Sequence, residues 1–156
     1  MYYIKSTEYN FLMYIEYMDI KKLHDALGNE KNEDIINTTF QNIEKDKNNI
    51  ITQLPISEEE QLDLYVKLEN YRYCANVENI KVGRDLVWIP LQDVDKIKTR
   101  AGRSAKIYDT YDDTNIIYII RGMLYTITFS KNLIFQKITD EEKHILQMVE
   151  HLQTIY

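Results

Sequence analysis

The sequence contains one cysteine, Cys74, two prolines and four glycines among its 156 residues. A single cysteine forms neither an internal disulfide nor a cysteine cluster for a metal, which agrees with a reducing compartment. Cys74 lies among aromatic residues in YRYCANV, where a free cysteine is typically a buried small hydrophobic residue. The phosphate-binding patterns GxxxxGK[ST] and GxGxxG are missing as well. These absences leave no diagnostic motif.

The sequence also lacks a long apolar run. No stretch approaches the ~18 residues of a membrane-spanning helix, and MYYIKSTEYNF has neither the basic region nor the apolar stretch of a signal peptide. We therefore expect a cytoplasmic protein, in the host cell if it is phage-encoded. The length fits one domain, and we expect a single α+β domain over residues 1–156.

Charge divides the chain into two halves. The net charge is −6. Residues 1–80 contain 15 acids and 8 bases, whereas residues 81–156 contain 10 acids and 11 bases. The acidity therefore belongs to the first half, which favours a basic partner over nucleic acid.

The first half, about residues 1–80, has the periodicity of helices. A first helix is predicted from Ser6 or Thr7 to Gly28, and a second is predicted to follow with Ile36, Phe40 and Ile43 on one stripe. A third starts at Ser57, which has capping-box spacing to Glu60. The residues expected on its buried side are Leu62, Tyr65, Val66 and Leu68.

After Gly83 the pattern changes to short runs rich in β-branched and aromatic residues. DLVWIPL, AKIYDTY, NIIYIIRG, MLYTITF and LIFQKI are separated by turn residues, which predicts an antiparallel meander of four or five strands. A terminal amphipathic helix is predicted from Thr139, with capping-box spacing to Glu142. We expect it to pack on one face of the meander and to bury Met148 and Val149. The fold class is α+β.

Patterns that support catalysis are weak. His144 and His151 lie seven residues apart on the terminal helix, about 10 Å, which is too far for both to bind one metal unaided. The acids in YDTYDD fall where a hairpin needs a turn. We predict no metal, cofactor or catalytic residue, although a dispersed carboxylate and histidine site remains the third hypothesis because catalytic residues need only meet in space.

One basic stretch stands apart. KIKTRAGRSAK is predicted to form a loop between two strands, and its cations suit a phosphate or nucleic-acid backbone. The alternative is a solvated loop paired with nearby acids. The candidate anion-binding residues are Lys96, Lys98, Arg100, Arg103 and Lys106.

Tyrosine is the most unusual residue, with thirteen copies against one tryptophan. Tyrosine is enriched at protein interfaces, and an acidic helical half bearing exposed tyrosines suits a basic protein surface. The candidate partner-binding residues are Glu58, Glu59, Asp63, Tyr71 and Tyr73.

Composition gives one resemblance of type. Ile, Asn, Lys and Tyr are abundant and Gly, Ala, Pro and Arg are scarce, which indicates an AT-rich genome. A short, acidic, tyrosine-rich domain from such a source resembles the small accessory proteins of phages and mobile elements, including immunity, antitoxin and anti-defence inhibitors. The resemblance implies a non-enzymatic protein that occupies a basic functional surface of another protein. A nucleic-acid or phosphate-ligand binder is the alternative, and the oligomeric state is not predicted.

Overall fold

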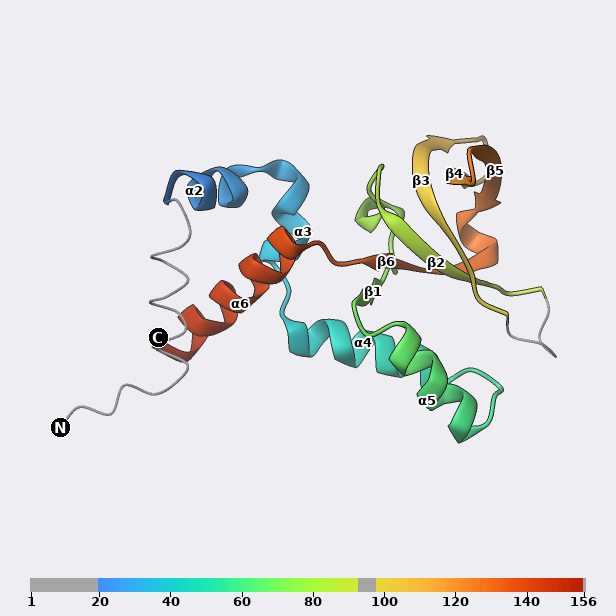
Figure 1. The fold of residues 1–156 in the computed structure, drawn as a ribbon, viewed down its shortest axis with the longest axis horizontal. Coiled ribbons are helices and arrows are strands. Elements are labelled where there is room, and N and C mark those ends of the chain that lie inside the picture. The colour runs from blue at the N-terminus through green and yellow to red at the C-terminus, as the bar shows by residue number, and fades with distance from the viewer. Residues whose placement is uncertain (1–19, 93–97, 156) are drawn as a thin grey trace. The chain divides into compact units, whose positions relative to one another are not determined.

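The computed structural model describes residues 20–92 and 98–155. Helices precede an antiparallel sheet, and a helix closes the chain, which confirms the predicted α+β class (Figure 1). The chain divides into two compact units, Met1–Ile43 with Thr139–Tyr156, and Glu44–Ile138. A single domain spanning both units stays a prediction.

The first unit is helical. It holds α2 (Ile20–Gly28), the single turn α3 (Glu33–Ile36) and α6 (Asp140–Ile155), and α6 lies against the other two. The predicted capping box at the start of α6 is confirmed. The backbone N–H of Glu142 donates to Thr139 Oγ1 at 3.2 Å, and the Thr139 N–H donates to Glu142 Oε1 at 3.0 Å.

The buried side of α6 differs from the prediction. Ile145 and Leu146 are fully buried, whereas Met148 and Val149 are only half-buried and Leu152 is exposed. Within the first unit α6 lies against α2 and α3, and its packing on the meander stays a prediction. Ile145 and Leu146 are adjacent in sequence, so the buried surface of α6 is wider than a single stripe. The i, i+3 and i+4 spacing that defined the predicted stripe does not include Leu146.

The second unit contains the sheet. Its strands follow the order β1-β6-β2-β3-β4-β5, and each neighbouring pair runs antiparallel. The five predicted runs correspond to β2 through β6, whereas no strand was predicted at β1. The strands are β1 (Tyr71–Tyr73), β2 (Asp85–Pro90), β3 (Arg100–Asp109), β4 (Thr114–Ile120), β5 (Met123–Thr128) and β6 (Asn132–Lys137).

Two helices, α4 (Phe40–Thr52) and α5 (Glu58–Lys67), cover one side of the sheet at β1, β6 and β2. Alternate residues of β2 point to opposite faces, as strand geometry requires. Val87 and Ile89 face the helices, whereas Leu86 and Trp88 belong to a second core on the other side. The residues of the helix-covered core are Ile51, Leu64, Leu68, Val87, Ile89 and Phe135.

The second core lies on the opposite face of the sheet, toward which β3, β4 and β5 curl (Figure 1). Its buried amide is satisfied: Gln136 accepts from the Lys81 N–H at 2.8 Å and donates to the Asn79 carbonyl at 3.1 Å. These bonds hold the segment before β2 against the sheet. The buried residues of this core are Cys74, Ile80, Leu86, Trp88, Ile116, Tyr118 and Ile134.

None of the helices in the described ranges is long and apolar enough to cross a membrane.

Candidate functional site

Helix α5 is fixed at its start by a side-chain cap. Ser57 Oγ accepts a hydrogen bond from the Glu60 N–H at 3.2 Å, as the spacing predicted. Leu64 is buried on its inner side, and Leu68, at the C-cap position, is buried as well. Leu62 and Val66 were predicted to be buried, and this prediction is wrong because both point outward.

The sequence QLDLYVKL contains two overlapping stripes. Leu62 and Val66 are four residues apart, and so are Leu64 and Leu68, so both pairs satisfy helical spacing. Only one pair can face the sheet. The helix turns Leu64 and Leu68 inward, which leaves a second apolar pair on the solvent side.

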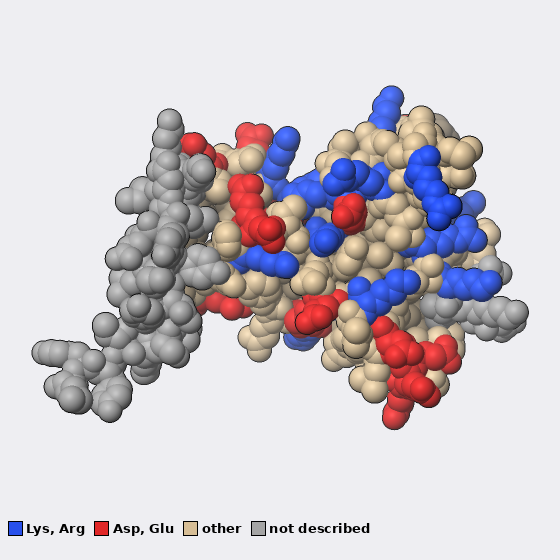
Figure 2. Space-filling model, viewed as in Figure 1, with Lys and Arg blue, Asp and Glu red and all other residues tan. Residues whose placement is uncertain are grey.

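This outward pair carries the strongest candidate surface of the chain. Leu62 is 65% exposed and Val66 is 75% exposed, one helical turn apart. Exposed carboxylates surround them at Glu58, Glu59 and Asp63. Figure 2 shows acidic side chains gathered over α5. We call these five residues the α5 face.

Tyr71 and Tyr73 lie on β1 and are half-buried against the helix-covered core. The Tyr73 ring lies 5.6 Å from that of Phe135. Burial raises the pKa of both phenols, and the negative charge of Asp85 contributes for Tyr71. Both tyrosines therefore contribute to packing. The apolar anchors that the acidic face needs are present instead in Leu62 and Val66, which sequence analysis placed in the core.

The basic stretch is not a loop over its full length. Strand β3 begins at Arg100, so Arg100 and Arg103 lie on a strand instead of a loop, and this part of the prediction is wrong. Lys106 also lies on β3, within the run AKIYDTY that was predicted as a strand. Lys98 precedes the strand and is exposed, and Lys96 lies outside the described residues. Gly102, the glycine of this stretch, is also a strand residue.

The cations of β3 are divided between the two faces of the sheet. Arg100 is paired with Trp88 and lies on the aromatic side, two residues from Gly102. Arg103 is paired with Ile119, on the opposite side. An irregularity between Ser104 and Lys106 puts Lys106 on that opposite side as well. Arg103 Nε also lies 3.6 Å from Asp85 Oδ1. Arg100 therefore points to the face opposite that of Arg103 and Lys106, and the three cations do not converge on one anion.

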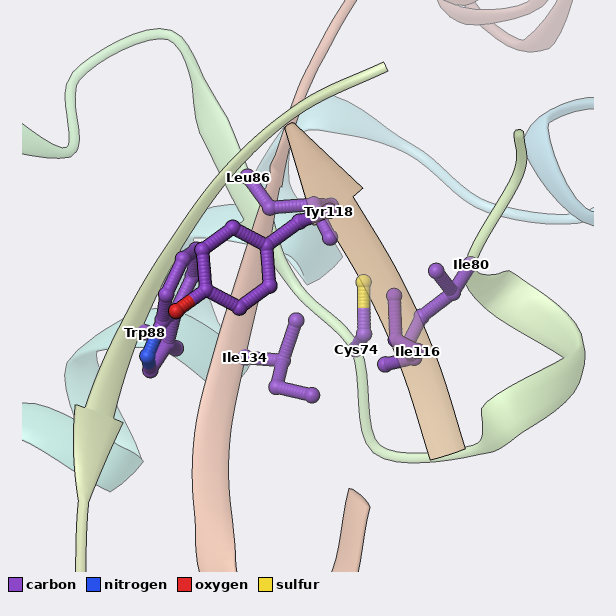
Figure 3. Packing of buried hydrophobic residues seen from close by; sticks show 7 residues of the cluster. All are labelled: Cys74, Ile80, Leu86, Trp88, Ile116, Tyr118 and Ile134. Atoms are coloured by element: carbon purple, nitrogen blue, oxygen red, sulfur yellow. The ribbon is translucent and has the colours of Figure 1, made fainter. Parts of the chain in front are cut away.

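Aromatic rings lie side by side across the curled part of the sheet. The Trp88 and Tyr118 centroids are 4.4 Å apart, as the close-up in Figure 3 illustrates. Tyr118 stacks on Tyr125 of β5 at 5.5 Å with an interplanar angle of 21°. Gly102 leaves room for this row, because a Cβ there would lie 2.6 Å from Cδ2 of Tyr118. The row runs from the buried core to the exposed edge strand.

The acids of YDTYDD form a turn, as predicted. Asp113 accepts hydrogen bonds from the Ser130 hydroxyl and from the Thr114 N–H, the latter at 2.8 Å. The Ser130 hydroxyl is the main reason that the pKa of Asp113 is lowered. Within the part of the chain that the structure describes, no three or more His, Cys, Asp or Glu side chains are grouped to hold a metal ion.

Comparison with known proteins identifies no relative: no family model, no curated protein and no solved structure matches the chain.

Proposed function

We propose that the chain is a non-enzymatic protein-binding module that docks through the α5 face onto a protein with a basic surface. The observation that carries the proposal is the exposure of Leu62 and Val66, one turn apart and surrounded by three carboxylates. Glu58 and Glu59 also stabilise the helix by interacting with the positive end of its dipole, but Asp63 lies beyond the first turn. The stability of the helix therefore does not explain Asp63 or the outward apolar pair.

Each group of the α5 face has a role in binding. Burying a leucine or valine against a partner contributes about 1.5–3 kcal/mol per side chain. The surrounding carboxylates attract a basic surface during encounter and exclude acidic proteins. An amphipathic helix docked in a groove is a common mode of recognition, and its anchors follow the i, i+4 spacing of Leu62 and Val66.

Binding to a basic surface would inhibit the partner. Many basic protein surfaces bind nucleic acid or phosphate, and an acidic helix on such a surface blocks access of that ligand. The chain thus acts as an inhibitor or accessory regulator, and its composition suits the immunity, antitoxin and anti-defence proteins of phages and mobile elements. The partner is defined by chemistry, as a basic protein surface with an apolar groove.

Quantitative affinity capture from the native host tests the proposal. Wild type is compared with Leu62→Ala/Val66→Ala, which leaves all carboxylates in place. Val82→Ala is the matched control because Val82 is another exposed valine of the same unit, outside α5. Since the replaced side chains are exposed, each variant should keep its stability within about 0.5 kcal/mol.

We expect one protein that wild type and Val82→Ala retain equally and that the double variant loses. Truncating both anchors should weaken binding by about 1–3 kcal/mol, or roughly 5- to 150-fold. Retention of that protein by the double variant contradicts the proposal. Micromolar binding of single- or double-stranded oligonucleotides that Arg100→Ala/Arg103→Ala abolishes favours the nucleic-acid alternative instead.

A further inference from the structure

Strand β5 forms one edge of the sheet and differs from the usual protected edge. It contains no charged residue, and Met123 and Leu124 are 61% and 67% exposed. Proline, lysine and bulges commonly protect edge strands, and MLYTIT contains neither proline nor lysine. Its pairing with β4 is regular from Met123 to Thr128. Among residues 20–92 and 98–155, no strand pairs with its outer edge.

The turn before β5 determines which backbone groups point outward. Arg121 and Gly122 form a two-residue turn, with φ angles of 50° and 77°. Such a turn makes Ile120 and Met123 the pair that exchanges hydrogen bonds, and the pattern then alternates along the strand. The backbone groups of Leu124 and Thr126 therefore point away from β4.

Thr128, two residues after Thr126, agrees with the assignment of outward-pointing backbone groups. The carbonyl of Thr128 also points outward, and the Asn132 side chain donates to it at 2.7 Å. That bond limits the free edge to the stretch around Leu124 and Thr126. An added strand can reach four backbone groups there, the N–H and C=O of these two residues.

We propose that this edge pairs antiparallel with β5 of a second copy of the chain, about a two-fold axis at Tyr125. The outward groups fix this register. Leu124 exchanges hydrogen bonds with Thr126 of the second copy, and Thr126 does so with Leu124. Tyr125 then lies opposite Tyr125 of the second copy in a pair without hydrogen bonds, where side chains approach most closely.

Charge argues for a second copy as the occupant. Across a two-fold axis the central residue of one strand lies opposite the same residue of the second copy. A charge at that position would therefore face an identical charge, which opposes pairing. β5 is uncharged throughout. The nearest cation along the chain, Arg121, lies in the turn, and antiparallel pairing puts the two turns at opposite ends of the joined strands.

The aromatic row supplies the side-chain contact. Tyr125 stacks on Tyr118, which in turn contacts Trp88, yet Tyr125 remains 43% exposed. In the proposed register, Tyr125 of the second copy lies beside it and continues the row through the axis. Cross-strand aromatic pairs are among the favourable contacts of antiparallel sheets.

Sedimentation equilibrium of the purified full chain tests the pairing. Wild type should reach twice the mass of the chain as its concentration rises, and Thr126→Pro should weaken this association at least ~10-fold. Proline is tolerated on an edge strand where the N–H faces outward, so this change removes no hydrogen bond within the sheet. Leu124→Lys is a second variant, because edge lysines oppose pairing and Leu124 is exposed. Val82→Lys adds the same charge away from β5 and should associate like wild type.

Cysteine cross-linking tests the register. Tyr125→Cys places two thiols opposite each other at a Cα separation of about 4.5 Å, within disulfide range. Leu124→Cys is the matched control, because its opposite residue is Thr126. Cys74 is buried and does not compete. We expect oxidation to link the Tyr125→Cys chains at least ~10-fold faster than the Leu124→Cys chains, since only the first pair meets this geometry.

Three results overturn the inference: wild type that stays monomeric over the whole concentration range, Thr126→Pro and Leu124→Lys chains that associate as tightly as wild type, or equal cross-linking of the two cysteine variants. Because α5 is not part of this edge, the outcome is independent of the proposed function. If wild type is monomeric and the Leu62→Ala/Val66→Ala variant still loses its partner, the inference about β5 is wrong and the proposed function is still supported.

Discussion

The ammonium nitrogen of Lys47 lies 2.8 Å from the carbonyl oxygen of Leu68, and the Lys47 side chain is only 1% exposed. The same nitrogen donates to the Tyr71 carbonyl at 3.1 Å and to Glu44 Oε1 at 2.9 Å. Leu68 is the C-cap residue of α5, and Tyr71 begins β1. One buried cation of α4 thus connects the end of the candidate docking helix to the edge of the sheet, at the negative end of the helix dipole.

Replacement of Lys47 should therefore destabilise the second unit. Lys47→Met keeps an apolar stem but removes the ammonium donor from the Leu68 and Tyr71 carbonyls, of which Leu68 retains the Tyr71 N–H. We expect a loss of about 2–4 kcal/mol in the free energy of unfolding. Urea titration followed by circular dichroism measures it. Lys45→Met is the matched control, because Lys45 is exposed on the same helix and should change stability by less than about 0.5 kcal/mol. Equal unfolding midpoints for the two variants would show that the buried contacts contribute nothing.

Gly102→Ala should disturb the aromatic row. The new methyl group would lie 2.6 Å from Cδ2 of Tyr118 and 3.3 Å from Cη2 of Trp88, so one ring must move. We expect a loss of about 1–3 kcal/mol from overpacking, together with a changed emission spectrum of the single tryptophan. Fluorescence-detected unfolding measures both.

The control for this substitution is Gly28→Ala, where a Cβ meets nothing within 4 Å. It should leave the emission of Trp88 unchanged. If Gly102→Ala is as stable as wild type and has the same spectrum, the close packing over this glycine is not a constraint on the fold.

Asp113 gives a prediction for pH. Because hydrogen bonds from Ser130 and Thr114 lower its pKa, the folded state favours the carboxylate more than the unfolded state does. That contribution is present above the unfolded pKa and is lost as the pH falls through the folded value. Asp113→Asn should therefore be less stable than wild type at neutral pH, and the difference should shrink below about pH 4.

Urea midpoints measured from neutral to acidic pH test this prediction. Asp112→Asn removes the same charge at an exposed neighbour in the turn, so it accounts for the effect of net charge alone. A constant difference between Asp113→Asn and wild type at every pH would exclude the carboxylate as its source.

Local signals in the sequence predicted much of the fold. Both capping-box patterns, Ser57 with Glu60 and Thr139 with Glu142, depend on residues three apart. The Thr139 box is formed in full, and at Ser57 the side-chain cap to the Glu60 N–H is formed. The runs of β2 to β6 also stand out, because β-branched and aromatic residues lie between turn residues. Such features need no knowledge of distant contacts.

The errors arise where tertiary packing chooses between equal local patterns. QLDLYVKL offers two apolar stripes, and only contact with Val87, Ile89 and Phe135 selects Leu64 and Leu68 for the core. Gly102 lies in the stretch that was predicted as a loop, yet the rings of Trp88 and Tyr118 leave room in this strand only for a residue without a Cβ. The partner-binding surface was accordingly predicted as the acids of α5 with Tyr71 and Tyr73, without Leu62 and Val66.

Association kinetics of the captured basic partner with three forms of the chain test the central claim most directly. The claim is that the α5 face binds through apolar anchors surrounded by steering charges. Leu62→Ala/Val66→Ala should raise the dissociation rate and leave the association rate nearly unchanged. Reversal of Glu58, Glu59 and Asp63 to Lys should instead slow association, most strongly at low salt. Association and dissociation rates equal to those of wild type in both variants would contradict the account.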